Sequence, residues 1–594
     1  MCGIAGKINW DAPLGAEAVI RMCDRMRHRG PDDYGVVNLN NIAMGHRRLS
    51  IIDLSKEASQ PMVSSDKRYY IVYNGEVYNF KELKDELESF GINFRTSSDT
   101  EVVLYSYIKW GPRALEKFNG MFALAIWDNE LKELFLARDR FGKKPLYYHK
   151  NGGKMTFSSE LSALLCDTEI PRAISYEALN CYLALGYILS PLTLYKDIFK
   201  LEIATFMVVS ESGKRVRKAR YWDYSEKFRE KVKSSEAEIA DNLLGLLENS
   251  VKRRLVGDVP IGAFLSGGID SSSVTGIMKK HQRGDLHTFS IGFDQKSYNE
   301  TDDAEQAAQW IGTIHHNKVC RINDSAKLIN DALDAYDEPF ADNSCIPTFV
   351  LAKLASRYVK VALSGDGADE IFAGYITYKA DKYYPIAKIV PSLLRRLLAL
   401  PEKNKVLRHQ KKLSFGYRRQ QFFYGTLHSP ERAHYLWRVI FRPEERIVIL
   451  GEDKRELVYD TDPFGVFKEY YEKARGLNRL DKNLYVDAMT WLADDILVKI
   501  DRACMKNSLE VRCPYLDVDL VTYAASIPAD LKMRGLKSKY ILKKALRGIL
   551  PNSILNKKKS GFSAPIGIWL KDDTVDEFKA FNRFIFNKLK CGRY

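Results

Sequence analysis

The sequence predicts two α/β units of different design in one chain: a layered αββα unit, then a unit with a parallel, doubly wound sheet and helical additions. In the first part, apolar and polar residues alternate over residues 71–73 and 122–126, and helical patterns cover residues 81–90 and 100–109. In the second part, two strands each end in a glycine-rich turn that leads into a helix. The pattern breaks at residues 221–223, so we place the boundary near 215–225 and expect domains of 1–215 and 216–594.

Residues 265–273 (LSGGIDSSS) form the clearest binding motif. They follow the apolar run 259–264 and precede a helix predicted over residues 274–280. Free N–H groups at a helix N-terminus attract anions, and Gly267 and Gly268 let the backbone approach a phosphate. Asp270 would repel phosphates unless a divalent cation lay between them, which indicates Mg²⁺. An ordinary strand-to-helix turn is the alternative. No Gly-Lys-Ser/Thr follows, so the motif is not a Walker A loop.

A second turn, residues 364–370 (SGDGADE), follows a strand predicted over residues 358–363. Ligands of parallel sheets lie at the carboxyl ends of the strands, so the two turns are expected to face one nucleotide. Asp270 and Asp369 are then candidate Mg²⁺ ligands on the pyrophosphate, and Asp366 lies near the acceptor. A solvated acidic turn is the alternative. Between the turns we expect a strand over 286–293 and a helix over 301–311, and before them a helix that begins with a capping box at 235–238.

Cys2 is the candidate nucleophile of the first part. Removal of Met1 would place the Cys2 thiol beside its own α-amino group, whose pKa near ~8 suits a general base. An oxyanion formed by attack on an amide needs donors, which the Asn74 side chain and the Gly75 backbone N–H could supply. A type I′ hairpin turn at Asn74-Gly75, between residues 69–73 and 77–80, is the structural alternative, and the two interpretations are compatible.

A site for free glutamine needs a cation for the α-carboxylate and carboxylates for the α-ammonium. Arg48 suits the first requirement, because its guanidinium can bind a carboxylate through two hydrogen bonds. Glu76 and Asp99 suit the second. Surface salt bridges are the alternative for Arg48 and Asp99.

Seven segments of the first part resemble the class II glutamine amidotransferase domain, in the order and spacing of that family. They are 2–6 (CGIAG), 27–32 (RHRGPD), 45–53 (GHRRLSIID), 73–79 (YNGEVYN), 98–101 (SDTE), 119–123 (NGMFA) and 138–142 (RDRFG). The resemblance implies the N-terminal-nucleophile fold. It also implies a catalytic set of Cys2, Asn74 and Gly75, and a glutamine-binding set of Arg48, Leu49, Ser50, Ile51, Ile52, Asn74, Gly75, Glu76 and Asp99.

The second part resembles the PP-loop domain of glutamine-hydrolysing asparagine synthetases. Besides the two turns, the similar segments are 337–342 (DEPFAD), 494–502 (DDILVKIDR), 508–517 (SLEVRCPYLD), 537–544 and 557–562. The resemblance implies ATP binding by Leu265, Ser266, Gly267, Gly268, Asp270, Ser271, Ile291, Ser364 and Gly365. It places Asp366 where the acyl-adenylate forms and Lys559 where charge on adenylate or pyrophosphate is balanced. Ala368, Cys345 and Cys513 depart from the usual pattern, and residues 379–480 have no clear counterpart.

Composition sets the remaining expectations. The 594 residues are 45% hydrophobic and 28% charged, with no apolar run near the ~20 residues that span a bilayer, so no membrane is expected as a partner. No secretory signal follows Met1, and nine cysteines without a CxxC pair suit a reducing compartment, so we expect a cytoplasmic protein. The net charge of +15 is concentrated in residues 379–419 and 532–559. Nucleic acid, anionic substrates such as ATP, and solvated helix faces could each explain these tracts. No nucleic-acid motif accompanies them, so none is expected as a partner.

These patterns and resemblances predict that aspartate, glutamine and ATP give asparagine, glutamate, AMP and pyrophosphate, with ammonia from glutamine consumed at an acyl-adenylate. The resemblance implies that the ammonia passes through an internal tunnel. The expected cofactors are ATP and Mg²⁺. The nearest alternative keeps the mechanism and changes the acceptor to a sugar uronate, a cell-wall precursor or a specialised metabolite. A non-catalytic protein and an RNA-modifying PP-loop enzyme are more remote alternatives. The oligomeric state stays open, with a homodimer among the possibilities.

Overall fold

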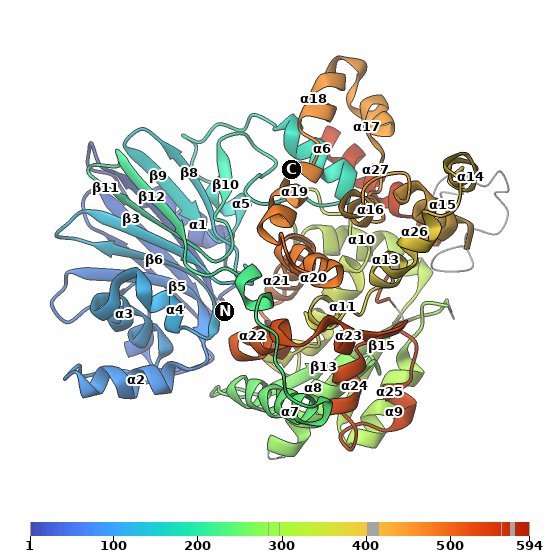
Figure 1. Cartoon of the computed structure of the whole chain (residues 1–594). Helices are drawn as coiled ribbons and strands as arrows, with labels where there is room; N and C mark the ends of the chain where they lie inside the picture. Colours follow the sequence, from blue (N-terminus) through green and yellow to red (C-terminus); the bar gives the residue numbers. More distant parts are fainter. Residues whose placement is uncertain are drawn as a thin grey trace.

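Two antiparallel sheets packed face to face form the first part of the chain, at the left of Figure 1. In this computed structural model, which describes residues 2–282, 284–295, 297–400, 415–559, 561–570 and 577–592, the strand orders are β10-β8-β9-β1-β3-β2 and β12-β11-β7-β6-β5-β4. The bounds of the first sheet are β1 Gly3–Asn9, β2 Asp33–Asn38, β3 Ile42–Arg48, β8 Tyr147–Asn151, β9 Lys154–Ser158 and β10 Ile198–Lys200. Those of the second are β4 Met62–Val63, β5 Tyr69–Val77, β6 Gly120–Asp128, β7 Glu133–Arg138, β11 Thr205–Ser210 and β12 Arg215–Arg220.

Helices cover the outer faces of both sheets. One apolar core lies between the sheets and includes Ile4, Met44 and Trp127, while a second core joins β5 and β6 to α2 (Phe80–Ser89) and α3 (Asp99–Trp110). The helices α1 (Glu17–Arg25) and α5 (Leu161–Leu164) cover the other sheet. The predicted αββα layering is therefore confirmed, and both predicted helices are present. The sheet continues to Arg220, beyond the predicted boundary at 215, and the division of the chain stays a prediction.

A parallel sheet, in the order β15-β14-β13-β16-β17, forms the centre of the second part. Its strands are β13 Ile261–Phe264, β14 His287–Phe293, β15 Ile314–Cys320, β16 Val361–Leu363 and β17 Glu510–Arg512. The predicted capping box at Ser235 opens α7 (Glu236–Arg253), and α9 (Thr301–Ile311) has the predicted bounds. Strand β16 is shorter than predicted, because residues 358–360 still belong to the turn that follows α11 (Cys345–Ala355).

Helices surround this sheet. They include most of residues 379–480, which have no clear counterpart in the family motifs. They are α8 Ile269–His281, α10 Ser325–Leu333, α12 Ala368–Ile371, α13 Ile376–Ala387, α14 Ser392–Leu398, α15 Phe415–Gly425, α16 Pro430–Leu436, α17 Pro443–Leu450, α18 Arg455–Asp460, α19 Phe464–Lys473, α20 Arg479–Met489, α21 Leu497–Met505, α22 Val518–Ser526, α23 Ala529–Lys532, α24 Tyr540–Ala545, α25 Asn552–Leu555, α26 Ile566–Trp569 and α27 Glu577–Lys590. A π-helical turn, Leu492–Ile496, precedes α21.

The two parts interlock. Helix α6 (Tyr176–Leu185) leaves the first part and packs against α17 and α18, as Figure 1 shows near the top of the molecule. The buried Asn180 side chain donates to the carbonyls of Val458 and Thr461, and the Tyr182 hydroxyl donates to the Asn582 carbonyl (3.0 Å) on α27. The N-terminus, marked N in Figure 1, lies beside the junction of the two parts.

Candidate active sites

Cys2 is buried directly before β1. Its backbone N–H donates to Asn74 Oδ1 (3.0 Å), and its carbonyl accepts from Arg29 Nε (3.0 Å). Burial raises the pKa of the Cys2 thiol, whereas a backbone hydrogen bond from Leu49 and the charge of Arg48 oppose that rise. The structure thus brings Asn74, Arg48 and Leu49, three residues predicted from sequence, to the thiol.

Asn74 and Gly75 lie inside strand β5, not in a hairpin turn, so the turn interpretation is wrong. The strand runs from Tyr69 to Val77 and pairs with the full length of β6, with Gly75 opposite Phe122. A Cβ at Gly75 would lie 2.3 Å from the Met121 carbonyl oxygen. Glycine is therefore required by the close approach of β6.

Arg48, predicted to bind a carboxylate, holds the loop that follows β3. Its guanidinium donates to the carbonyl oxygens of Ser55 (2.8 Å), Ile52 (3.4 Å) and Asp53. In the same loop, Leu49 and Ile51 are buried, and the Ser50 N–H donates to Asp32 Oδ2 (2.9 Å). Residues 48–52 therefore form one wall beside Cys2. Binding of a glutamine carboxylate by Arg48 stays a prediction.

Glu76 and Asp99 form a buried pair of carboxylates. Asp99 Oδ2 accepts from the Tyr73 hydroxyl (2.8 Å) and the Val77 N–H (3.1 Å), and burial raises its pKa to about 6. Burial and the charge of Asp99 raise the pKa of Glu76 well above its ordinary value. Glu76 Oε1 has no hydrogen-bond partner among the described residues. Two buried acids with an unused acceptor oxygen suit a ligand that brings a positive charge.

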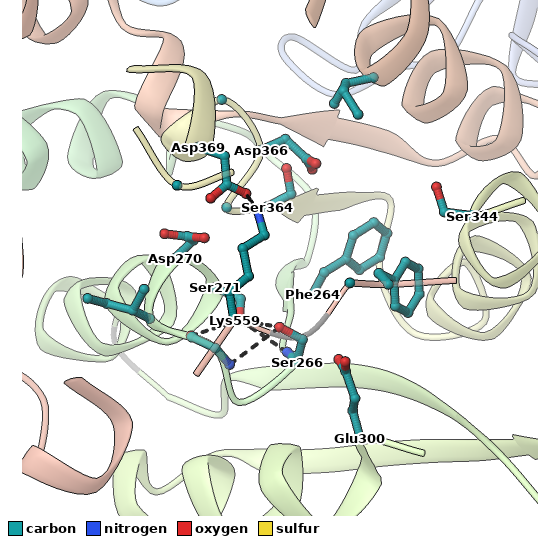
Figure 2. A pocket seen from close by; sticks show the side chains of 18 of the residues that line it. Phe264, Ser266, Asp270, Ser271, Glu300, Ser344, Ser364, Asp366, Asp369 and Lys559 are labelled. Atoms are coloured by element: carbon teal, nitrogen blue, oxygen red, sulfur yellow. Dashed lines mark hydrogen bonds and ion pairs between the residues drawn. The ribbon is translucent and has the colours of Figure 1, made fainter. Parts of the chain in front are cut away.

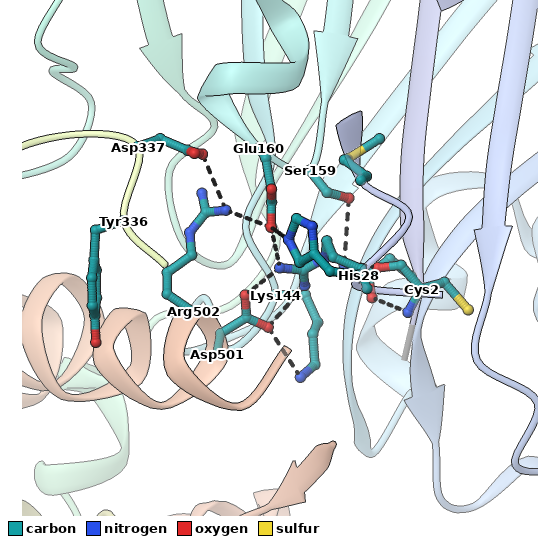
Figure 3. Close-up of polar contacts among 12 residues, drawn as sticks. Cys2, His28, Lys144, Ser159, Glu160, Tyr336, Asp337, Asp501 and Arg502 are labelled. Carbon is teal, nitrogen blue, oxygen red and sulfur yellow. Dashed lines mark hydrogen bonds and ion pairs between the residues drawn. The ribbon is translucent and has the colours of Figure 1, made fainter. Parts of the chain in front are cut away.

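A buried charged network connects Cys2 to helix α21 of the second part (Figure 3). The Arg29 guanidinium, fully buried, donates to the Cys2 carbonyl, to Glu160 Oε1 (3.0 Å) and through two bonds to Asp501 (2.9 and 3.0 Å). Arg502, the next residue of α21, pairs with the same Glu160 oxygen (3.0 Å) and with Asp337 (3.3 Å). The backbone of Cys2 is thus held by a side chain that is itself held by the second part.

Arg512 also connects the first site to the second part of the chain, and more directly. Its guanidinium donates to Glu510 Oε1 (2.6 Å) and to Glu76 Oε2 (3.4 Å). Its backbone carbonyl accepts from the Ser364 N–H (3.0 Å), because β17 lies beside β16 and extends the sheet there. One residue therefore contacts the carboxylate pair near Cys2 and the first residue of the second glycine turn.

The two glycine turns meet at the carboxyl ends of β13 and β16. A Cβ at Gly365 would lie 2.8 Å from both Asp270 Cβ and Ser271 N, so the turns touch. Gly267 has φ +68°, and a Cβ there would lie 2.4 Å from the Asp303 carbonyl oxygen. Ser266 N–H donates to Ser271 Oγ (3.1 Å), as Figure 2 shows. Helix α8 begins directly after Gly268, earlier than predicted, so its first N–H groups belong to the turn.

A cavity of about 400 Å³ opens over these turns (Figure 2). Of the residues predicted to bind ATP, the following line it: Leu265, Ser266, Gly268, Asp270, Ser271, Ile291, Ser364 and Gly365. Asp366, Asp369 and Lys559 line it as well. Gly267 is predicted but does not line it, because it faces the backbone of α9.

Two lysines balance the carboxylates of this cavity. Lys539 Nζ lies 2.6 Å from both oxygens of Asp270 and 2.5 Å from Asp369 Oδ1, and Lys559 Nζ pairs with Asp369 Oδ2. Burial alone would raise the pKa of Asp369, but the two lysines lower it overall. The carboxyl oxygens of Asp270 and Asp369 converge on one point, as two ligands of a shared cation do. Mg²⁺ is commonly held by one or two carboxylates together with substrate phosphates, so the pair fits it.

Charges of both signs line the rest of the cavity. Lys499 Nζ lies 2.9 Å from Asp342 Oδ2, and the Tyr375 hydroxyl donates to Glu370 Oε1 (2.5 Å). Burial and the charge of Asp369 raise the pKa of Glu370 to about 7. Burial also raises the pKa of Asp366, and the charge of Lys499 opposes that rise. These five groups all line the cavity.

Comparison with known proteins agrees with this arrangement. Residues 1–222 match the glutamine amidotransferase domain family, and residues 242–580 match the family described as asparagine synthase. The chain is 35% identical to asparagine synthetase [glutamine-hydrolyzing] 1 of Bacillus subtilis (strain 168) over 587 residues, covering 96% of this chain and 88% of that protein.

The chain belongs to the asparagine synthase family.

Two further relatives show the breadth of this family. A putative asparagine synthetase [glutamine-hydrolyzing] 2 of Methanocaldococcus jannaschii is 36% identical and covers 85% of this chain and 98% of its own length. A protein of Penicillium rubens named amidase chyE is 28% identical and covers 92% of this chain and 84% of its own length. Membership of the asparagine synthase family implies the use of glutamine, ATP and a carboxylate substrate.

Several residues of both sites carry no role in the sequence prediction: Arg29, Glu160, Glu370, Lys499, Asp501, Arg512 and Lys539. Arg29 lies in the segment RHRGPD, Glu370 in the second turn, Lys499 and Asp501 in DDILVKIDR, Arg512 in SLEVRCPYLD and Lys539 in 537–544, all of which resemble family motifs. Their place in these motifs was the available signal, whereas Glu160 lies in no such motif. Nothing in the pattern says which of many charged side chains is buried.

Proposed function

We propose that this member of the asparagine synthase family makes asparagine from aspartate, with glutamine as the nitrogen donor and ATP cleaved to AMP and pyrophosphate. The proposal supplies the acceptor and assigns roles to residues. Its support is the chemistry of the two sites and the direct contacts between them.

At the first site, removal of Met1, which lies outside the described residues, would free the α-amino group of Cys2 as the base. The Cys2 sulfur would attack the side-chain amide carbon of glutamine, and the Asn74 amide and the Gly75 N–H would stabilise the oxyanion. Glu76 and Asp99 would bind the α-ammonium. Arg48 would exchange its contacts with loop carbonyls for the α-carboxylate, and Leu49, Ser50, Ile51 and Ile52 would form the wall. Ammonia leaves, and water then releases glutamate.

At the second site, ATP would lie over the two glycine turns, with its phosphates against the N–H groups that begin α8. The aspartate β-carboxylate would attack the α-phosphorus, and pyrophosphate would leave. Lys539 and Lys559 would then offset phosphate charge as they now offset Asp270 and Asp369. When bound, Mg²⁺ would neutralise the pyrophosphate, held by Asp270 and Asp369. Ammonia would attack the acyl carbon beside Asp366, with loss of AMP.

The charges of Lys499, Asp342 and Glu370, which line the same cavity, support the choice of aspartate. Lys499 is a cation suited to an α-carboxylate, and Asp342 and Glu370 are carboxylates suited to an α-ammonium. An amino-acid acceptor presents both groups, whereas a sugar uronate has no ammonium for the acids. The same mechanism on another carboxylate remains the second candidate, since the related amidase chyE carries a different name.

An acceptor screen tests this choice. Purified protein, glutamine and Mg-ATP are incubated with aspartate, glutamate or uronic acids, and AMP formation is measured. We expect AMP with aspartate only, and Lys499→Met should raise the KM for aspartate by about 10- to 100-fold. AMP formed with a uronate and not with aspartate would replace this acceptor while leaving the amidotransferase mechanism in place. Glutaminase turnover without AMP from any acid would contradict the ligase itself.

A further inference from the structure

Helices α13 and α14 expose an unusual number of large apolar side chains. We define the α13–α14 face by eight residues that are at least 45% exposed: Ile376 (57%), Tyr383 (45%), Ile386 (62%), Ile389 (82%), Leu393 (70%), Leu394 (47%), Leu397 (56%) and Leu400 (56%). The other exposed apolar side chains among the described residues are scattered along the chain. Concentrated exposed apolar surface marks an interaction site, whereas isolated exposed apolar residues need no explanation.

The spacing shows that each helix presents one apolar stripe. Ile376, Tyr383 and Ile386 are separated by seven and three residues, and Leu393 and Leu397 by four, which places each set on one side of a helix. The opposite side of α13 is buried in the second part through Tyr378, Asp381, Tyr384 and Ala387. Helix α13 is thus anchored by one side while its apolar side faces solvent, and α14 buries one side chain, Arg395.

The charges of the same segment have one sign. Between residues 376 and 400 the sequence has five basic residues and one acidic residue, Asp381. Asp381 is buried and pairs with Arg479 (2.5 Å), whereas Lys382, Lys388 and Arg396 are exposed. The ammonium groups of Lys382 and Lys388 donate to the carbonyl oxygens of Met533 (3.0 Å) and Thr426 (3.3 Å). The sequence alone predicted solvated helix faces for this basic tract. The structure adds that exposed apolar side chains lie between the charges and that the segment exposes no carboxylate.

The exposed apolar side chains and the positive charge together favour one kind of partner. A second copy of the face would bring like charges together, so self-association is disfavoured. Residues 401–414 follow in the sequence and hold three large apolar residues, too few to cover eight. Nucleic acid is bound through aromatic stacking and phosphate contacts, and seven of the eight residues are aliphatic. Apolar side chains beside lysine and arginine are what the surface of an anionic bilayer accommodates.

We propose that the α13–α14 face docks the protein onto an anionic lipid bilayer. The eight apolar side chains enter the boundary between headgroups and acyl chains. Arg396 reaches the lipid phosphates, and Lys382 and Lys388 add positive charge beside it. No described helix is long and apolar enough to cross a membrane, so the protein lies on the surface. The proposal departs from the expectation that no membrane is a partner, which rested on the lack of a spanning segment.

Vesicle co-sedimentation of the full chain tests the proposal. Vesicles of phosphatidylcholine alone are compared with vesicles that also contain phosphatidylglycerol, at low and high salt. We expect binding to the anionic vesicles only, weakened by salt because screening acts on exposed charges. The double variant Leu393→Asp/Leu397→Asp should lower the partition coefficient at least about tenfold, and Lys388→Ala/Arg396→Ala should lower it about threefold or more.

Val448→Asp is the matched control, because Val448 is 80% exposed on α17, outside the face. It should bind vesicles as the unmodified protein does. Glutamine hydrolysis, which uses no residue of the face, verifies that each variant is folded. Failure of the unmodified protein to bind anionic vesicles would overturn the proposal, as would unchanged binding by the double Asp variant. If the α13–α14 face supports dimers or nucleic-acid binding and the protein does not bind vesicles, the face serves another partner.

Discussion

The two sites each contain a pair of buried carboxylates, and the pairs are neutralised in opposite ways. Glu76 and Asp99 have raised pKa values, and the cation within reach is Arg512, which contacts one oxygen of Glu76 at 3.4 Å. Asp270 and Asp369 share Lys539; the pKa of Asp369 is lowered by Lys539 and Lys559, while burial and the charge of Asp369 raise the pKa of Asp270. The first pair is prepared to receive a positive group, whereas the second is already balanced and can exchange its lysines for a metal-bound polyphosphate.

This difference agrees with the proposed ligands. Free glutamine brings one ammonium, and an incompletely neutralised acid pair binds it without displacing an internal partner. ATP brings several negative charges, which an unbalanced acid pair would repel. Lysines that pair with the acids in the free protein can turn to the phosphates when Mg²⁺ takes the acids. Both pairs are electrostatically prepared, but for ligands of opposite charge.

The largest effect is expected from Cys2→Ala, which separates the two sites. Removal of the nucleophile should lower glutamine hydrolysis and glutamine-dependent synthesis by at least about 10³-fold. Synthesis with ammonium salts should persist, because the second site is untouched. Glutamate and AMP formation measure the two activities. Glutamine-dependent AMP formation by this variant would show that the sites are not arranged as proposed.

Lys539→Met tests the pair formed by Asp270 and Asp369, whose negative charges Lys539 neutralises. It leaves Asp270 and Asp369 without their shared cation, so the pKa of both acids should rise, and synthesis from ammonia should fall by about 10²-fold. Glutamine hydrolysis in the absence of ATP should change little. Lys537→Met, on the neighbouring exposed lysine, is the matched control. Equal losses of synthesis in both variants would show that the pairing of Lys539 with the two acids is not what synthesis requires.

Asp99→Asn tests the pair formed by Glu76 and Asp99, which is proposed to bind a cationic group. Loss of one charge should raise the KM for glutamine by about 10- to 100-fold and leave ammonia-dependent synthesis unchanged. Because the pKa of Asp99 is raised to about 6, the free site loses this charge as pH falls through 6, and the KM for glutamine should rise there. The Asn variant should lack that rise. A KM that is independent of pH in the unmodified protein would contradict the assignment.

Asp99 also has a predictable effect on stability. Its folded pKa lies above the ordinary value of 3.8, so the folded state binds the proton more tightly than the unfolded state does. The contribution of Asp99 to the free energy of unfolding is therefore most favourable below pH 4 and declines as pH rises to 6. Thermal unfolding of the Asn variant between these values should show a smaller decline than that of the unmodified protein.

The smallest effect is expected from Arg512→Lys, which keeps the charge but cannot contact Glu510 and Glu76 together. We expect a change of about fivefold in how strongly ATP and acceptor stimulate glutamine hydrolysis. Ammonia-dependent synthesis should remain and verifies the fold. Stimulation equal to that of the unmodified protein would show that Arg512 does not couple the two carboxylate pairs.

Prediction from sequence succeeded where a few adjacent residues determine the outcome. The glycine turns, the capping box at Ser235 and the bounds of α9 depend on local backbone demands. It failed for Asn74-Gly75, because this dipeptide often forms a turn, and the long pairing of β5 with β6 overrides that preference here. ATP binding by Gly267 stays a prediction; the structure shows that its missing side chain permits the contact with α9.

The sequence by itself determined the layered fold, the parallel sheet with its two glycine turns, and the acids and the thiol that carry the chemistry, since each is encoded within a short segment. The tertiary structure alone decided which cations face those acids. Lys539 reaches Asp270 from 269 residues away, and Arg512 reaches Glu76 from 436. With 91 lysines and arginines in the chain, local pattern cannot select these two. Their selection depends on burial, because a charge removed from water needs a partner held in place by the fold.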